Sequence, residues 1–210
     1  MAKQERALRT RKVLIESAAE LFSRDGFEVV TLAAISTRAG VSNGALHFHF
    51  PSKAILAAAV REEAAQRFER IISGERPPPQ FGGSLQALVD TSHALLQSLG
   101  HDAVLRAGFG LGDGAAGVGG GRDLHKRWHA WVDDAVARSA HEGLLSDVSP
   151  RDLVATVVGA TAGFAALGGH DVRWLSRTTL TRFWTLLLPR IASGQGLRGV
   201  VAAGRQAEAS

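Results

Sequence analysis

Residues 31–50 read TLAAISTRAGVSNGALHFHF, and they carry the clearest signals of local structure in the chain. Thr31 is a predicted N-cap for a helix over residues 32–39, and Ser42 is a predicted N-cap for a second short helix. Gly40 suits the turn between the two because a left-handed backbone costs glycine nothing. Two short helices joined by so tight a turn form a helix-turn-helix unit.

The second helix of this unit has the composition of a helix that enters a DNA groove. It begins Ser42-Asn43-Gly44-Ala45, which is small and polar, and it then becomes aromatic. Small polar residues at a helix N-terminus can approach base edges in a major groove that is about 12 Å wide. Thr31, at the start of the first helix, is predicted to contact phosphate.

The composition limits the other possibilities. The chain has 210 residues, a net charge of +4 and no cysteine, so disulfides and thiolate metal sites are excluded and a cytoplasmic location is expected. No apolar run approaches the roughly 20 residues that span a bilayer, and no signal peptide or membrane partner is expected. Five of the first twelve residues are cationic and only Glu5 opposes them, which suits either a polyanion or a solvated terminus.

The rest of the chain also reads as helices, so the predicted fold class is all-α. Apart from a short apolar patch at residues 27–30, no segment alternates with period two. We expect a three-helix DNA-binding domain with a basic arm, a helical effector-binding and dimerisation domain, and a disordered tail. Their expected bounds are residues 1–53, 54–194 and 195–210, with a proline-rich linker over 73–83.

Residues 41–53 carry a resemblance to a known family. VSNGALHFHFPSK is similar to the helix-turn-helix signature of TetR-family repressors, and most of all to the γ-butyrolactone-receptor branch. The resemblance covers roughly residues 3 to 192. The other segments similar to that branch are RAGF at 106–109, KRWH at 126–129, VGATAGF at 158–164, WLSR at 174–177 and FW at 183–184.

Two residues depart from the branch's usual pattern. Asn43 stands where the branch usually has lysine, and His47 stands where it usually has tyrosine. Asparagine suits a bidentate hydrogen bond to adenine. The His-Phe-His-Phe sequence at 47–50 resembles the pseudo-receptors of antibiotic-producing actinobacteria, which respond to an antibiotic or its intermediate.

The resemblance implies a set of DNA-binding positions. Ser42, Asn43, Gly44 and His47 would face bases or nearby phosphates, while His49 and Lys53 would hold phosphates without reading sequence. Phe48 and Phe50 are expected in the core. The full predicted DNA-binding set is Thr31, Ser42, Asn43, Gly44, Ala45, His47, His49 and Lys53.

An effector site is expected in the second half, as the resemblance implies. In the butyrolactone receptors a tryptophan that matches Trp128 closes over the ligand and a nearby threonine binds its polar end. Alignment on the glycines places Ala160 at that threonine's position and Thr161 beside it. Small-molecule sites are apolar with few polar groups. The predicted lining residues are Phe109, Trp128, Val157, Thr161 and Phe164.

The last two helices carry excess apolar surface, which marks an interface. TetR-like proteins dimerise by pairing these helices, and a two-fold dimer would read a pseudo-palindromic operator with half-sites about 34–36 Å apart. The predicted dimer-interface residues are Leu167, Phe183, Trp184 and Leu187.

Three other patterns in the sequence match motifs of different functions. Residues 40–44 match the nucleophile elbow G-x-S-x-G of serine hydrolases, with Ser42 as nucleophile. Residues 112–117 match the dinucleotide fingerprint G-x-G-x-x-G, but more glycine follows and a flexible loop is expected. His125 and His129 are spaced like metal ligands on a helix, yet solvated histidines are expected there. No metal, cofactor or enzymatic activity is predicted.

The predicted function is a ligand-responsive transcriptional repressor. It would bind duplex DNA as a homodimer and be released by a small hydrophobic effector: an antibiotic, its intermediate or a γ-butyrolactone-like signal. The alternatives are a helical DNA-binding regulator without an effector and a serine hydrolase that uses Ser42.

Overall fold

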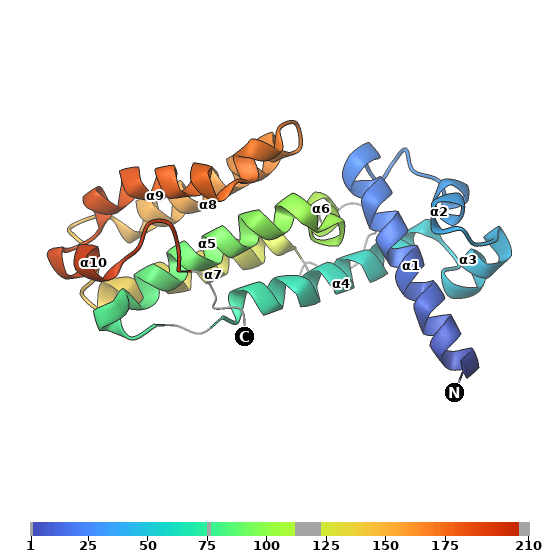
Figure 1. Ribbon diagram of the computed structural model, residues 1–210, viewed down its shortest axis with the longest axis horizontal. Coiled ribbons are helices and arrows are strands. Elements are labelled where there is room, and N and C mark those ends of the chain that lie inside the picture. The colour runs from blue at the N-terminus through green and yellow to red at the C-terminus, as the bar shows by residue number, and fades with distance from the viewer. Residues whose placement is uncertain (1, 75–76, 112–122, 206–210) are drawn as a thin grey trace. The chain divides into compact units, whose positions relative to one another are not determined.

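A computed structural model describes residues 2–74, 77–111 and 123–205 (Figure 1). These residues form helices and short helical turns, and no strand is assigned within them. The all-α prediction is therefore confirmed. No helix among them is long and apolar enough to cross a membrane. The dinucleotide-like pattern at 112–117 lies outside the described residues.

The chain divides into two compact units, Met1–Phe68 with Asp102–His125, and Glu69–His101 with Lys126–Ser210. The predicted boundary after Lys53 therefore differs from the observed one. The reason is packing between α4 (Lys53–Ile72) and α6 (Ala103–Gly110). A Cβ on Gly108 would overlap the Cβ of Ala64, and the ring centres of Phe68 and Phe109 are 5.9 Å apart. Most of α4, together with α6, thus belongs to the first unit.

The first unit is built around α1, with α2 and α3 on the same side of it (Figure 1). Leu14 and Ala18 of α1, Ile35 of α2 and Leu46 of α3 are fully buried. Arg38 of α2 forms an ion pair with Glu20 of α1. The bounds are α1 Ala2–Asp25, α2 Leu32–Ala39, α3 Asn43–His49, α4 Lys53–Ile72 and α6 Ala103–Gly110.

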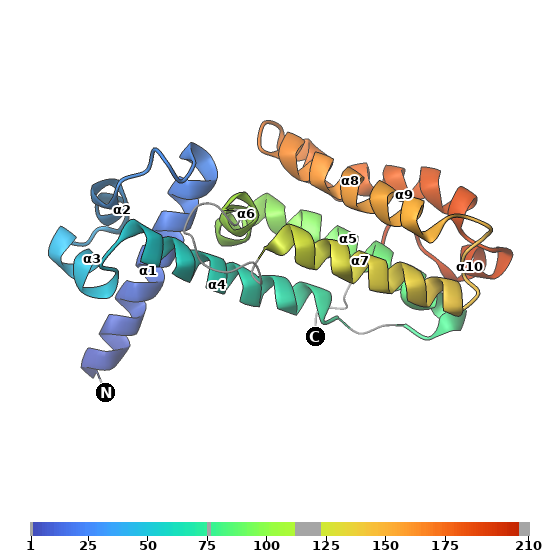
Figure 2. The ribbon, with the colours of Figure 1, turned by 180° about the vertical axis from the view of Figure 1, so that it is seen from behind.

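The main helices of the second unit run along a common direction (Figures 1 and 2). Their buried faces carry leucine, valine and tryptophan side chains. The carboxylate of Glu142 accepts hydrogen bonds from the backbone N–H and hydroxyl of Ser84, so it satisfies one of the free N–H groups in the first turn of α5 (Gly83–His101). The bounds are η1 Pro79–Phe81, α5 Gly83–His101, α7 Leu124–His141, α8 Pro150–Gly168, η3 Val172–Leu175, α9 Arg177–Ile191 and α10 Gly194–Gly199.

The C-terminal segment is folded as far as Arg205, so the prediction that the tail from 195 onwards is disordered is wrong for residues 195–205. Residues 200–205, which we call the C-terminal strap, are held on α5. The side-chain amide of Gln86 accepts a hydrogen bond from the backbone N–H of Val201 and donates one to its carbonyl. The carboxylate of Asp90 accepts a hydrogen bond from the backbone N–H of Arg205. These contacts satisfy backbone groups that a disordered tail would leave to water.

Candidate functional site

The turn between α2 and α3 fixes the angle of the predicted DNA-binding pair. Gly40 has a φ of 66°, its N–H donates to Thr37 O, and the N–H of Val41 donates to Ser36 O at 3.0 Å. This double hydrogen bond is a Schellman motif, and it requires a residue that tolerates the left-handed region. Thr31 caps α2 and Ser42 caps α3, each accepting from a backbone N–H. The helix-turn-helix unit predicted from residues 31–50 is confirmed.

One face of α3 is buried and the other is open. Leu46 and Phe50, one turn apart, are fully buried, with Phe50 only 1% exposed. Phe48 is 82% exposed, so its predicted core position is wrong while that of Phe50 is confirmed. The reason is helical phase, because a residue two positions from Leu46 and from Phe50 points away from both. The open face of α3, defined here as its exposed residues, comprises Asn43, Gly44, His47 and Phe48.

Asn43 is held in place by the neighbouring helix. The hydroxyl of Ser36 in α2 donates to Oδ1 of Asn43 at 2.6 Å. Ser36 is buried and Asn43 is exposed. One amide oxygen lone pair and both amide N–H groups of Asn43 remain for another partner. A side chain that is oriented before binding loses less freedom when it pairs with a base edge.

Lys53 has a different role from the predicted one. Its Nζ donates to the carbonyls of Phe27, Glu28 and Val30 at 2.8, 3.1 and 3.0 Å, and it lies 4.4 Å from the ring centre of Phe27. An ammonium group has three N–H donors, and all three are used. The predicted phosphate contact by Lys53 is therefore not supported by the geometry. Lys53 instead fixes the loop before α2.

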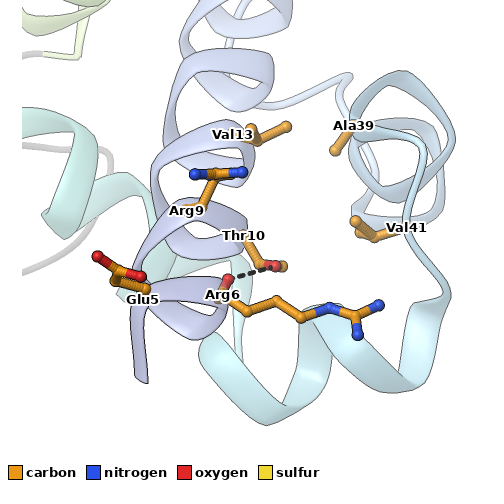
Figure 3. A pocket seen from close by; sticks show the side chains of 7 residues that line it. All are labelled: Glu5, Arg6, Arg9, Thr10, Val13, Ala39 and Val41. Carbon is orange, nitrogen blue, oxygen red and sulfur yellow. Dashed lines mark hydrogen bonds between the residues drawn. The ribbon is translucent and has the colours of Figure 1, made fainter. Parts of the chain in front are cut away.

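The basic arm borders a hollow beside the turn (Figure 3). The hollow measures about 460 Å³, and in Figure 3 the Arg6 side chain extends from α1 towards the side where Val41 lies. Neither Arg6 nor Arg9 forms an ion pair with a described residue. The open guanidinium groups suit an external anion. The residues that line the hollow are Glu5, Arg6, Arg9, Thr10, Val13, Ala39 and Val41.

In the second unit a buried polar pair joins α7 to α8. The indole N–H of Trp128 donates to the hydroxyl of Thr161 at 2.8 Å, and both side chains are 3% exposed. The hydroxyl of Thr161 donates in turn to the carbonyl of Val157 at 2.9 Å. The structure thus brings together Trp128, Val157 and Thr161, three of the five predicted effector residues.

Trp128 also contacts a second tryptophan one turn further along α7. The rings of Trp128 and Trp131 are stacked, with centres 5.4 Å apart and planes 9° from parallel. The indole N–H of Trp131 donates to the carbonyl of Ile72, the last residue of α4, at 3.2 Å. A chain of contacts therefore runs from Thr161 through two indoles to the end of α4.

Comparisons with known proteins agree with these features. Residues 14–60 match the family model of bacterial regulatory proteins of the tetR family. The chain is 31% identical over 198 residues to the A-factor receptor protein of Streptomyces griseus, which covers 91% of this chain and 67% of that protein. The chain belongs to the TetR family, in its γ-butyrolactone-receptor branch. It is therefore a TetR-type transcriptional regulator, as the resemblance implied.

Solved structures of the same branch have the same fold. A γ-butyrolactone receptor described as ArpA-like is 26% identical, with a TM-score of 0.74 over 94% of this chain and 95% of that one. CprB of Streptomyces coelicolor, in complex with its biological operator sequence, is 26% identical with a TM-score of 0.76. That alignment covers 94% of this chain and 96% of CprB.

Two of the predicted effector residues, Phe109 and Phe164, pack against other side chains of this TetR protein than the Trp128–Thr161 pair. Phe109 belongs to the first unit, where its ring meets those of Phe68 and His125 edge to face. Phe164 packs against Trp174 and Phe183, with ring centres 6.1 and 5.8 Å apart. The structure therefore groups Phe164 with the aromatic cluster of α8, η3 and α9 rather than with the Trp128–Thr161 pair.

The four predicted dimer-interface residues differ in how exposed they are. Trp184 is 0% exposed, so it is part of the core of its own unit and its assignment to an interface surface is wrong. Phe183 and Leu187 are half-buried and Leu167 is exposed. Sequence reasoning missed Leu186, which is 79% exposed. The helical position of Leu186, two residues from the buried Trp184 and Leu188, was the available signal.

Ser42 does not lie in the setting of a nucleophile elbow. That motif needs a strand before the serine and a helix after it. Here the residue follows the C-terminal turn of α2, and its hydroxyl oxygen accepts from the backbone N–H of Ala45. The G-x-S-x-G pattern is explained by helix capping. Among the described residues, no group of three or more side chains is arranged to hold a metal ion.

Proposed function

We propose that this TetR-family chain is a homodimeric repressor that binds a pseudo-palindromic operator and is released by a small hydrophobic effector. The observation that carries DNA binding is the open face of α3, which follows the Schellman turn at Gly40. Arg6 and Arg9 of α1 lie beside Val41 of that turn. Base edges are read from such a face, and phosphate contacts by Arg6, Arg9 and the capping hydroxyls of Thr31 and Ser42 position it.

The operator contacts divide by chemistry. Asn43 and His47 offer hydrogen-bonding groups to bases, while Gly44 and Ala45 allow close approach. His49 is half-buried at the end of α3, and we propose that it binds a phosphate. CprB has been solved with its operator, which supports the same mode for this chain.

A second copy of the chain is the proposed partner of α8 and α9. The exposed face of α8 is lined by small residues, and a Cβ on Gly159 or Gly163 would meet nothing within 4 Å. Leu186 of α9 and Leu167 of α8 add exposed apolar surface. Such a surface fits a two-fold interface in which helices approach closely. Its small residues are Ala155, Gly159, Ala162, Gly163 and Ala166.

The proposed effector binds at the Trp128–Thr161 pair. The indole N–H of Trp128 already donates to the hydroxyl of Thr161. An effector with a hydrogen-bond acceptor would replace Thr161 as the acceptor of that N–H. Movement of Trp128 would disturb its stacking on Trp131 and hence the end of α4. The effector can shift the protein only by its differential affinity for the two states. The resemblance of the sequence at 47–50 to the pseudo-receptors favours an antibiotic or its intermediate as that effector.

A mobility-shift titration with footprinting tests this proposal. The full chain is incubated with DNA from upstream of its own coding sequence, with and without an extract of a culture that produces the antibiotic. We expect two protected half-sites and release by the extract, and a synthetic γ-butyrolactone serves as the comparison arm. Absence of binding at low salt contradicts the DNA-binding role, and binding that no extract reverses contradicts the effector role.

A further inference from the structure

We infer that Phe48 is a sequence-reading residue that packs against the 5-methyl group of a thymine in the operator. This inference rests on the proposed DNA binding by α3. Phe48 is 82% exposed, which is more than any other phenylalanine among the large hydrophobic residues that the structure exposes. A large aromatic surface kept in water costs free energy unless a partner covers it.

The surroundings of Phe48 indicate a groove partner. Phe48 follows Gly44 by one turn on the open face of α3, and a Cβ on Gly44 would meet only Ser42 Oγ, at 4.0 Å. On the open face of α3, the surface at Gly44 therefore has no side chain, while the surface one turn later carries the ring of Phe48. DNA can approach closely over Gly44 while the ring of Phe48 extends further into the groove.

The ring is held by its neighbour. His49 meets it edge to face, with ring centres 5.3 Å apart and planes 83° from parallel. This contact limits the rotation of an otherwise exposed side chain. Because the ring carries no hydrogen-bonding group, it cannot read a donor or an acceptor. The thymine methyl is the apolar group that the major groove offers.

Methyl deletion in the DNA tests the inference. A duplex is first selected from a random-sequence library with the full wild-type chain, and each thymine is then replaced singly by deoxyuridine. At one thymine per half-site we expect the wild-type Kd to rise about fourfold, which corresponds to one buried methyl. The variant Phe48→Ala should bind the parent duplex more weakly and show no further loss on that deoxyuridine duplex.

A matched control separates this effect from a general loss of aromatic surface. Phe81 is 58% exposed in η1, and Phe81→Ala should keep the wild-type sensitivity to deoxyuridine. If no thymine is sensitive, or if Phe48→Ala retains the sensitivity, the inference is wrong and the ring contacts sugar or backbone instead. If the library yields no enriched duplex, the proposed DNA-binding function itself fails.

Discussion

The indole N–H of Trp131 donates a hydrogen bond to the backbone carbonyl of Ile72, 3.2 Å away, at the C-terminal end of α4. The same indole is stacked on Trp128, which is bonded to Thr161. Residues 53–68 of α4 belong to the first unit, and residues 69–72 belong to the second. The hydrogen bond from Trp131 therefore links the end of this helix to the proposed effector site, beside the ion pair of Arg127 in α7 with Glu69 in α4.

Trp131→Phe removes this hydrogen bond and keeps an aromatic ring on Trp128. We expect operator affinity to stay within twofold of the wild type, while the extract concentration that releases half of the DNA rises about fivefold. That rise corresponds to about 1 kcal/mol of coupling, the size of one hydrogen bond. Mobility-shift titration measures both quantities. Trp174→Phe, in η3, is the control variant. If Trp131→Phe is released from DNA at the same extract concentration as the wild type, Trp131 does not take part in the release mechanism.

Thr161→Val should destabilise the fold because it leaves the buried indole N–H of Trp128 without its acceptor. The expected loss is about 1–3 kcal/mol in the free energy of unfolding, measured by urea denaturation. In a Trp128→Phe background the same change should cost less, since the N–H is already absent. Equal losses in the two backgrounds would show that the hydrogen bond between Trp128 and Thr161 adds nothing to stability.

Lys53→Met should lower stability without changing the salt dependence of DNA binding. Three carbonyls lose a charged donor, and we expect a loss of about 2–4 kcal/mol. Lys12→Met, on an exposed part of α1, should cost less than about 0.5 kcal/mol.

Arg9→Ala is the matched variant for the salt dependence, and it should flatten the slope of log Kd against log salt by about one. The slope of Lys53→Met should remain that of the wild type. If Lys53→Met instead flattened the slope of log Kd against log salt and left stability unchanged, the result would support the phosphate contact predicted from the sequence.

His93 should make the fold less stable in mild acid. Burial lowers the pKa of His93, and nearby Arg177 lowers it further, while its hydrogen bond to Ala202 O and the charge of Asp90 oppose the shift. With the folded pKa below the usual 6.5, the unfolded chain binds the proton more readily, so stability is lost as the pH falls through and below 6.5.

His93→Gln tests that dependence because its amide can donate to Ala202 O without titrating. Thermal unfolding between pH 8 and pH 5 should show a smaller decline for the variant than for the wild type. Parallel declines would mean that other groups cause the acid sensitivity.

Much of the DNA-binding unit could be predicted from the sequence because its signals are local. Thr31, Gly40 and Ser42 mark helix ends through their own backbone and capping preferences. The exposure of Phe48 follows from the same helical phase that buries Leu46 and Phe50, so it too could have been predicted.

Contacts between distant segments could not be predicted in this way. The three carbonyls that Lys53 binds lie 23 to 26 residues away, and their convergence depends on the folded loop. The C-terminal strap reads VVAAGR and has no helical pattern of its own. It is held by hydrogen bonds to Gln86 and Asp90, which lie 115 residues before the groups they bond.

Base discrimination by Asn43 tests directly whether the open face of α3 reads DNA sequence. The wild-type chain and Asn43→Ala are titrated by fluorescence anisotropy against the selected duplex, its single-base variants and a random duplex. We expect Asn43→Ala to lose about 1–3 kcal/mol of discrimination at one base pair per half-site and to bind random DNA as the wild type does. Equal weakening on every duplex, or no binding by the wild type even at low salt, would contradict this expectation.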